Sequence, residues 1–179
     1  MSSEEELLLG SGIERQGQAM NEVVHHLLSL LQPQTDYLDY YGRFLRTRWG
    51  SVINSVSADG TMTRLDSTYS IDESVSSLRG AMYTPGAGTW FSMQMTIWPN
   101  GRSQSRFNYD DEPDWGPIPP GGISFLTDQH FFPIDEDKQP EWLKKRLAEG
   151  VADLKRYGKK SYPEWLVEMI AAGNKPAWL

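Results

Sequence analysis

Residues 88–115 constrain the fold of this chain more than any other stretch. Two segments, 89–98 and 102–109, alternate large apolar side chains with polar ones, which is typical of strands with one buried face. Between them lies Pro99-Asn100-Gly101, and the Asn-Gly pair tolerates the positive φ that a tight turn requires. The sequence therefore predicts a β-hairpin here, and hence an antiparallel sheet.

Helical periodicity surrounds this hairpin. A first helix is expected to start at Ser11, which has the spacing of a capping box with Glu14. Its apolar residues, from Ile13 to Leu31, lie at three- and four-residue spacing, and Pro33 marks its end. A second helix is expected to open at Ser70 and to end near Tyr83, before a Pro-Gly segment that cannot continue it. Two more helices are expected at 140–157 and 164–172, marked by the Pro-Glu-Trp sequences that begin at Pro140 and Pro163.

The remaining segments have the composition of strands and loops. Strands are expected at about 37–47, 51–56 and 61–65, whereas 123–132 has no clean period and is interpreted as a short strand or an apolar loop. The predicted fold class is α+β, with a single antiparallel β-sheet packed with N-terminal, central and C-terminal helices. One domain is expected over residues 1–179, of which 1–10 form a frayed turn or a short arm.

Composition excludes several classes of protein. The net charge of −7 argues against binding to duplex nucleic acid, and the absence of cysteine excludes disulfides, thiolate metal sites and a cysteine nucleophile. The first residues lack the positive charge and apolar run of a secretory signal, and no apolar run approaches the ~18 residues of a membrane span. We expect a cytoplasmic protein with neither nucleic acid nor membrane among its partners.

A cluster of acidic side chains follows the second strand of the hairpin. Four carboxylates occur within five residues, next to rigid aromatic side chains. Charge steers the encounter of two proteins and aromatic side chains supply much of the affinity, so the cluster indicates an interface with a basic partner. In the alternative interpretation, the aromatic side chains fill the core and the acidic side chains are only solvated. The predicted partner-binding residues are Tyr109, Asp110, Asp111, Glu112, Asp114 and Trp115.

Catalysis is the alternative function. A small metal-dependent hydrolase is conceivable with Asp110, Asp111, Glu112 and His130 as acids, bases or ligands, and Asp128 lies near that histidine in the sequence. However, the spacings of a calcium loop, a phosphate-binding loop, a dinucleotide site and the common hydrolase motifs are all absent. The adjacent His25 and His26 cannot face one way on a helix. We therefore expect no enzyme, no catalytic residue, no metal and no cofactor.

The hairpin and its surroundings resemble the YezG-like immunity protein family, the antitoxins of bacterial polymorphic toxins. The similarity extends from the N-terminal helix to Trp142-Leu143 and is sharpest from Ile71 to Pro113. It rests on an acidic helix start, a strand opening, a turn and a motif at the exit of the hairpin, which are Ile71-Asp72-Glu73, Gly88-Thr89-Trp90-Phe91, Asn100-Gly101 and Phe107-Asn108-Tyr109-Asp110-Asp111-Glu112-Pro113.

This resemblance implies a non-enzymatic cytoplasmic inhibitor that binds a cognate secreted toxin and blocks its active site until export. The target implied is a nuclease or a toxin that consumes NAD, because both present an anion-binding site. Tyr109, Asp110, Asp111 and Glu112 match the family motif, and our hypothesis is that these side chains fill the cleft of the toxin. A general adaptor without a toxin partner is the third possibility.

Overall fold

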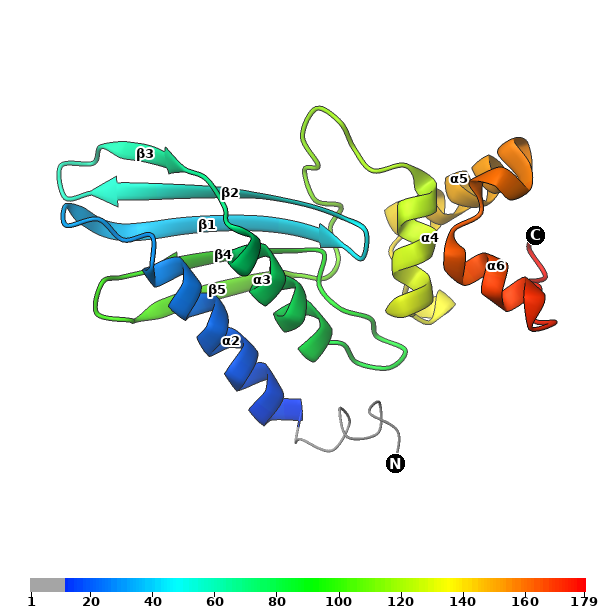
Figure 1. Cartoon of the computed structure of the whole chain (residues 1–179), viewed down its shortest axis with the longest axis horizontal. Helices are drawn as coiled ribbons and strands as arrows, with labels where there is room; N and C mark the ends of the chain where they lie inside the picture. Colours follow the sequence, from blue (N-terminus) through cyan, green and yellow to red (C-terminus); the bar gives the residue numbers. More distant parts are fainter. Residues whose placement is uncertain (1–11) are drawn as a thin grey trace. The chain divides into compact units, whose positions relative to one another are not determined.

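The computed structural model describes residues 12–179, which form two compact units (Figure 1). The first unit comprises residues 12–43, 50–84 and 89–109, and the second comprises 44–49, 85–88 and 110–179. One domain is predicted from the sequence, but the chain passes between the units several times, so no linker of distinct composition marks their boundary. The predicted arm at 1–10 and the capping role of Ser11 lie outside the described residues.

An antiparallel sheet of five strands in the order β3-β2-β1-β4-β5 confirms the predicted α+β class. The hairpin predicted around Asn100-Gly101 is also present. Strand β4 pairs with β5, with Ser92 opposite Asn108, and Gly101 in the turn has φ +83°. The three earlier strands lie close to their predicted bounds. The strands are β1 (Thr35–Leu45), β2 (Arg48–Ser57), β3 (Met62–Leu65), β4 (Ser92–Ile97) and β5 (Ser103–Asn108).

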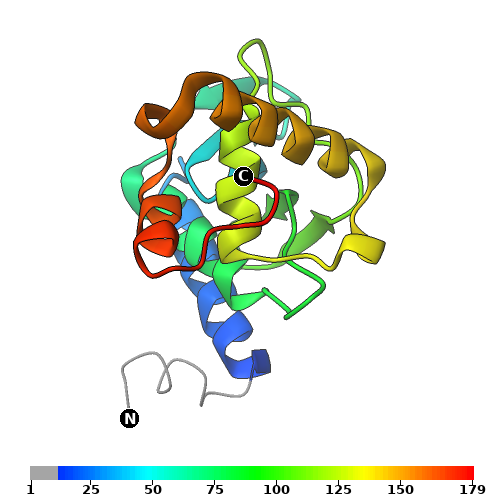
Figure 2. The same cartoon turned by 90° about the vertical axis from the view of Figure 1, so that its right-hand side faces the viewer.

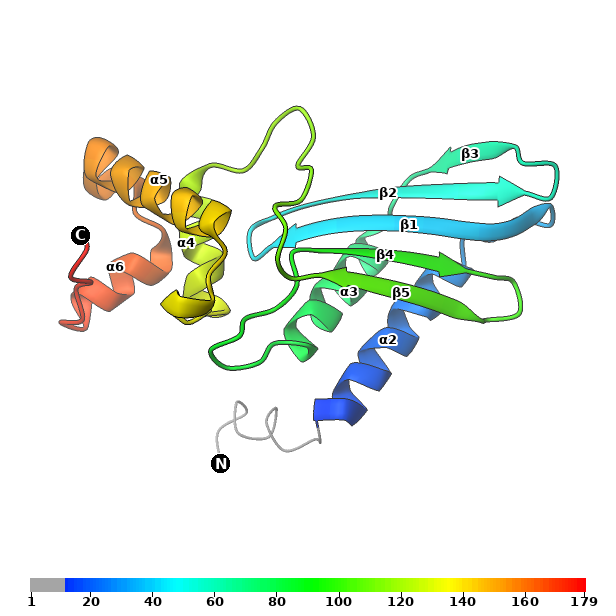
Figure 3. The same ribbon diagram turned by 180° about the vertical axis from the view of Figure 1, so that it is seen from behind.

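Helices α2 (Gly12–Leu28) and α3 (Tyr69–Ala81) cover one face of this sheet (Figure 3). The second helix starts one residue before the predicted Ser70, because the Thr68 hydroxyl accepts a hydrogen bond from the Ile71 amide at 3.3 Å and caps it. Apolar side chains of both helices and of the strands beneath them are fully buried, among them Val23, Leu27, Ile71, Val75, Leu78, Leu38 and Met95.

Trp90 anchors the start of β4 in the core of the first unit. Its side chain is fully buried and packs on Phe107, with ring centroids 5.5 Å apart. The buried Arg79 donates from Nε to the Trp90 carbonyl at 2.7 Å, and the Thr89 hydroxyl donates to the Arg79 carbonyl at 2.7 Å. The aromatic residue that begins the hairpin therefore stabilises the fold and presents no binding surface.

The second unit is built on three α-helices, α4 (Gly122–Phe131), α5 (Glu141–Tyr157) and α6 (Glu164–Ala171), with short 3-10 turns between them (Figure 2). The last two confirm the predicted helices, each of which follows a proline. Their common core contains Leu126, Leu154, Trp165 and Leu166. These C-terminal helices pack on one another, whereas α2 and α3 are the helices of the sheet unit.

Helix α4 replaces the short strand or apolar loop predicted for residues 123–132. Four consecutive residues of α4, Phe125 to Asp128, are buried, so its apolar side chains do not follow a single stripe. A helix enclosed on several sides loses the amphipathic period by which a surface helix is recognised. The structure thus corrects this part of the prediction.

Helices α4 and α5 touch through two glycines. A Cβ atom on Gly122 would lie 2.2 Å from the backbone nitrogen of Gly150, and a Cβ on Gly150 would lie 2.5 Å from the carbonyl oxygen of Gly122. Only glycine permits so close an approach of two backbones. This contact fixes α5, whose side chains hold the segment described next.

Along residues 12–179, no helix has both the length and the apolar character needed to cross a membrane.

Candidate functional site

The predicted acidic cluster forms an exposed segment at the start of the longest stretch of the second unit, residues 110–179. Residues 110–114, hereafter the acidic segment, begin two residues after the end of β5 and lead into the loop before α4. Asp110, Asp111, Glu112 and Asp114 are exposed, whereas Pro113 between them is buried. The proline holds the segment to the protein while the carboxylates face solvent.

Helix α5 fastens the acidic segment at two points. The indole Nε1 of Trp142 donates a hydrogen bond to the Asp110 carbonyl oxygen at 2.6 Å. One turn further along α5, the Arg146 guanidinium pairs with the Glu112 carboxylate at 2.7 Å and also with Glu149 at 3.0 Å. The hydrogen bond to Glu112 is the main reason that the pKa of Arg146 is raised above its usual value. Glu112 therefore has a structural contact inside the protein.

The acidic segment ends in a hydrogen-bonded turn, next to the buried ring of Trp115. The Asp114 carboxylate accepts a hydrogen bond from the Gly116 amide at 2.8 Å, where Gly116 has φ +75°. Trp115 is only 8% exposed, and its ring meets Phe125 edge-on at 5.9 Å. Trp115 was predicted to bind a partner; the structure places its side chain in the core, where it supports the segment from below.

Tyr109 is the last residue of the first unit and is 39% exposed. Partial burial raises the pKa of its phenol above the ordinary value. Of the six predicted partner-binding residues, Tyr109, Asp110, Asp111 and Asp114 thus present surface, Glu112 is held by Arg146 and Trp115 is buried.

The residues considered for a hydrolase have separate roles. The buried Asp128 carboxylate accepts a hydrogen bond from the Arg46 amide at 2.7 Å. His130 instead stacks on Trp165, with ring centroids 4.4 Å apart, and the partial burial of its imidazole lowers its pKa. Within residues 12–179, no three histidine or carboxylate side chains are grouped as metal ligands would be.

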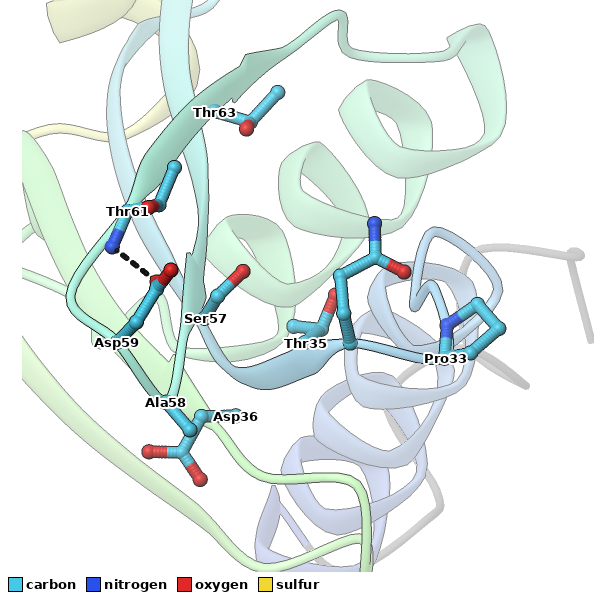
Figure 4. Close-up of a pocket in the computed structure, with 9 residues that line it drawn as sticks. Pro33, Thr35, Asp36, Ser57, Ala58, Asp59, Thr61 and Thr63 are labelled. Carbon is cyan, nitrogen blue, oxygen red and sulfur yellow. Dashed lines mark hydrogen bonds between the residues drawn. The ribbon is translucent and has the colours of Figure 1, made fainter.

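A polar pocket of about 690 Å³ lies in the first unit, where the start of β1 faces the turn between β2 and β3 (Figure 4). Asp59 in this turn accepts a hydrogen bond from the Thr61 amide at 2.9 Å, and this bond lowers the pKa of its carboxyl group. The Thr35 hydroxyl is already paired with Ser55 at 2.8 Å. No aromatic or cationic side chain lines this pocket, so it lacks groups that would stack on a ligand or pair with an anion.

A second pocket, of about 490 Å³, lies in the second unit and is hereafter the α6 pocket. Its lining includes Arg46 from the turn after β1, Glu164 and Glu168 from α6, Phe131 of α4, and Pro163. Sequence reasoning missed this pocket, as it missed Trp142 and Arg146 as supports of the acidic segment. No periodicity or spacing joins residues so far apart in the chain.

No protein-family model matches this sequence, and a search of curated proteins finds no significant relative.

Proposed function

We propose that this protein is a non-enzymatic immunity protein that binds a secreted bacterial toxin in the cytoplasm and occludes its active site through the acidic segment. The observation that carries the proposal is the exposure of Asp110, Asp111 and Asp114 on a backbone that Trp142 and Arg146 hold in place. The resemblance of residues 71–113 to YezG-like immunity proteins points to the same role.

The anchoring of the segment favours a role in binding. Ordering a flexible loop on association costs free energy, so a loop that is already fastened loses less on meeting its partner. Several carboxylates held close together repel one another and attract a surface of opposite charge. An active site that handles phosphate groups provides such a surface, as in a nuclease or in a toxin that consumes NAD.

Capture of the partner is the first test. The full-length protein carrying an affinity tag is recovered from the native cell lysate, and proteins present in equal amount are identified by mass spectrometry. The proposal expects a single protein with a basic domain whose toxicity is relieved by co-expression. Recovery of a partner that is not toxic would favour the adaptor instead.

Charge reversal then tests the segment itself. The double variant Asp110→Lys/Asp111→Lys substitutes neither partner of the ion pair between Glu112 and Arg146. Reversing one charge at an interface changes the interaction by about 2 kcal/mol at close range in water, which corresponds to about a 30-fold loss of affinity per charge at low salt. The matched control is Glu136→Lys/Asp137→Lys, which reverses two exposed carboxylates elsewhere in the same unit.

Titration calorimetry against the captured partner at low and high salt measures both variants. We expect the first variant to weaken binding strongly at low salt and the control to have little effect. Equal affinities for the wild type and the Asp110/Asp111 variant would remove these carboxylates from the interface.

A further inference from the structure

The α6 pocket is lined by side chains of opposite charge. Arg46 lines it from the turn after β1, and Glu164 and Glu168 line it from positions one helical turn apart on α6. Although these side chains face the same space, no ion pair joins Arg46 to either glutamate in the structure of residues 12–179. The positive group, Arg46, and the negative pair, Glu164 and Glu168, therefore do not neutralise each other, and they are hereafter the positive and negative ends of the pocket.

The positive end is fixed by contacts inside the protein. The Arg46 amide is bonded to the buried Asp128 carboxylate at 2.7 Å, which holds the turn after β1. The Arg46 guanidinium lies over the Phe131 ring, 4.8 Å from its centroid. Such a contact orients the guanidinium without neutralising it, so Arg46 retains its attraction for an anion.

The negative end contains two like charges on the same face of α6. Glu164 and Glu168 are four residues apart, and carboxylates at this spacing repel each other on a helix. Both side chains are exposed, and neither has an ion-pair partner among the described residues. A cation placed between them would relieve the repulsion.

The lining of the α6 pocket also has an apolar part. Phe131, which is 44% exposed, and Pro163 both line the pocket. The volume of about 490 Å³ lies within the range of small-molecule sites. A matching ligand has an anionic group, an aliphatic chain and a terminal cation.

We propose that the α6 pocket binds a basic amino acid, lysine or arginine, that has a free α-carboxylate. The carboxylate pairs with Arg46, the side-chain cation lies between Glu164 and Glu168, and the aliphatic stem contacts Phe131 and Pro163. A free amino acid and the C-terminal residue of a peptide share this chemistry. This site is separate from the acidic segment, and its occupancy does not depend on the immunity role.

Calorimetry of the full chain with a series of ligands tests the proposal. We expect binding of L-lysine or L-arginine, and at least a 10-fold loss with norleucine, which lacks the cation, and with arginine amide, which lacks the carboxylate. The tripeptide Gly-Gly-Lys distinguishes the sources, because it binds only if the pocket accepts a peptide C-terminus. No binding of either amino acid or of the tripeptide, or equal binding of norleucine, would overturn the proposal.

Variants of each end provide the second measurement. Arg46→Gln and Glu164→Gln/Glu168→Gln are each expected to weaken binding at least 10-fold. Arg48→Gln and Glu136→Gln/Asp137→Asn alter exposed charges that do not line the pocket and are expected to bind as the wild type does. Circular dichroism verifies that each variant folds. Unchanged binding by both pocket variants would refute the assignment, and the ligand series on the wild type decides the question if a variant does not fold.

Discussion

The contact between Gly122 and Gly150 leads to a prediction in which glycine-to-alanine substitutions at two sites change the free energy of unfolding in opposite directions. In a helix interior, alanine is more favourable than glycine by about 1 kcal/mol. At Gly17 in α2, a Cβ would meet no atom within 4 Å. We therefore expect Gly17→Ala to raise the free energy of unfolding by about 0.5–1 kcal/mol.

At Gly150 the added atom cannot be accommodated. Its Cβ would lie 2.5 Å from the Gly122 carbonyl oxygen and 2.6 Å from the carbonyl carbon, whereas ordinary contacts start at 3.4 Å. These are backbone atoms, which cannot rotate away, so α4 and α5 must separate by roughly 1 Å. Overpacking costs about 1–3 kcal/mol, and rigid neighbours place Gly150→Ala at the upper end. After the gain in helix propensity, the net loss is about 2 kcal/mol.

Urea unfolding followed by circular dichroism measures both effects. With a slope of about 2 kcal/mol per molar urea, Gly150→Ala lowers the midpoint by about 1 M and Gly17→Ala raises it slightly. Hydrogen exchange of α4 and α5 amides reports directly on the second unit, because the two units need not unfold together. If Gly150→Ala proves as stable as Gly17→Ala, the close crossing of α4 and α5 is wrong.

Two further predictions concern residues around the candidate sites. Trp142→Phe retains an aromatic ring near Phe125 but removes the donor to the Asp110 carbonyl, so we expect a loss of about 0.5–1 kcal/mol in stability and faster hydrogen exchange in residues 109–116. Burial lowers the pKa of His130 in the folded protein. As the pH falls, the His130 imidazole therefore binds a proton in the unfolded chain at a higher pH than in the folded protein. The free energy of unfolding consequently falls as the pH drops from about 7.5 through the folded pKa. The difference in unfolding free energy between pH 7.5 and 5.5 should be smaller in His130→Asn; an identical difference would contradict the assignment.

The sequence by itself determined those parts of the fold that depend on neighbours along the chain. Asn100-Gly101 set the central hairpin, because a tight turn needs backbone angles that few residues adopt. The prolines before α5 and α6 and the apolar stripe of α2 likewise express local preferences. The acidic segment was also visible as a cluster of exposed charge, although the sequence did not show what holds it.

Only the tertiary structure decided how distant residues meet. Helix α4 could not be recognised because its apolar period is lost where it is enclosed, and the division into two units was hidden because their segments alternate along the chain. Glu112 meets Arg146 across 34 positions, and the α6 pocket joins Arg46 to Glu164 and Glu168. Local preference fixes a backbone within a few residues, whereas such contacts arise only when whole helices pack, as α4 and α5 do through Gly122 and Gly150.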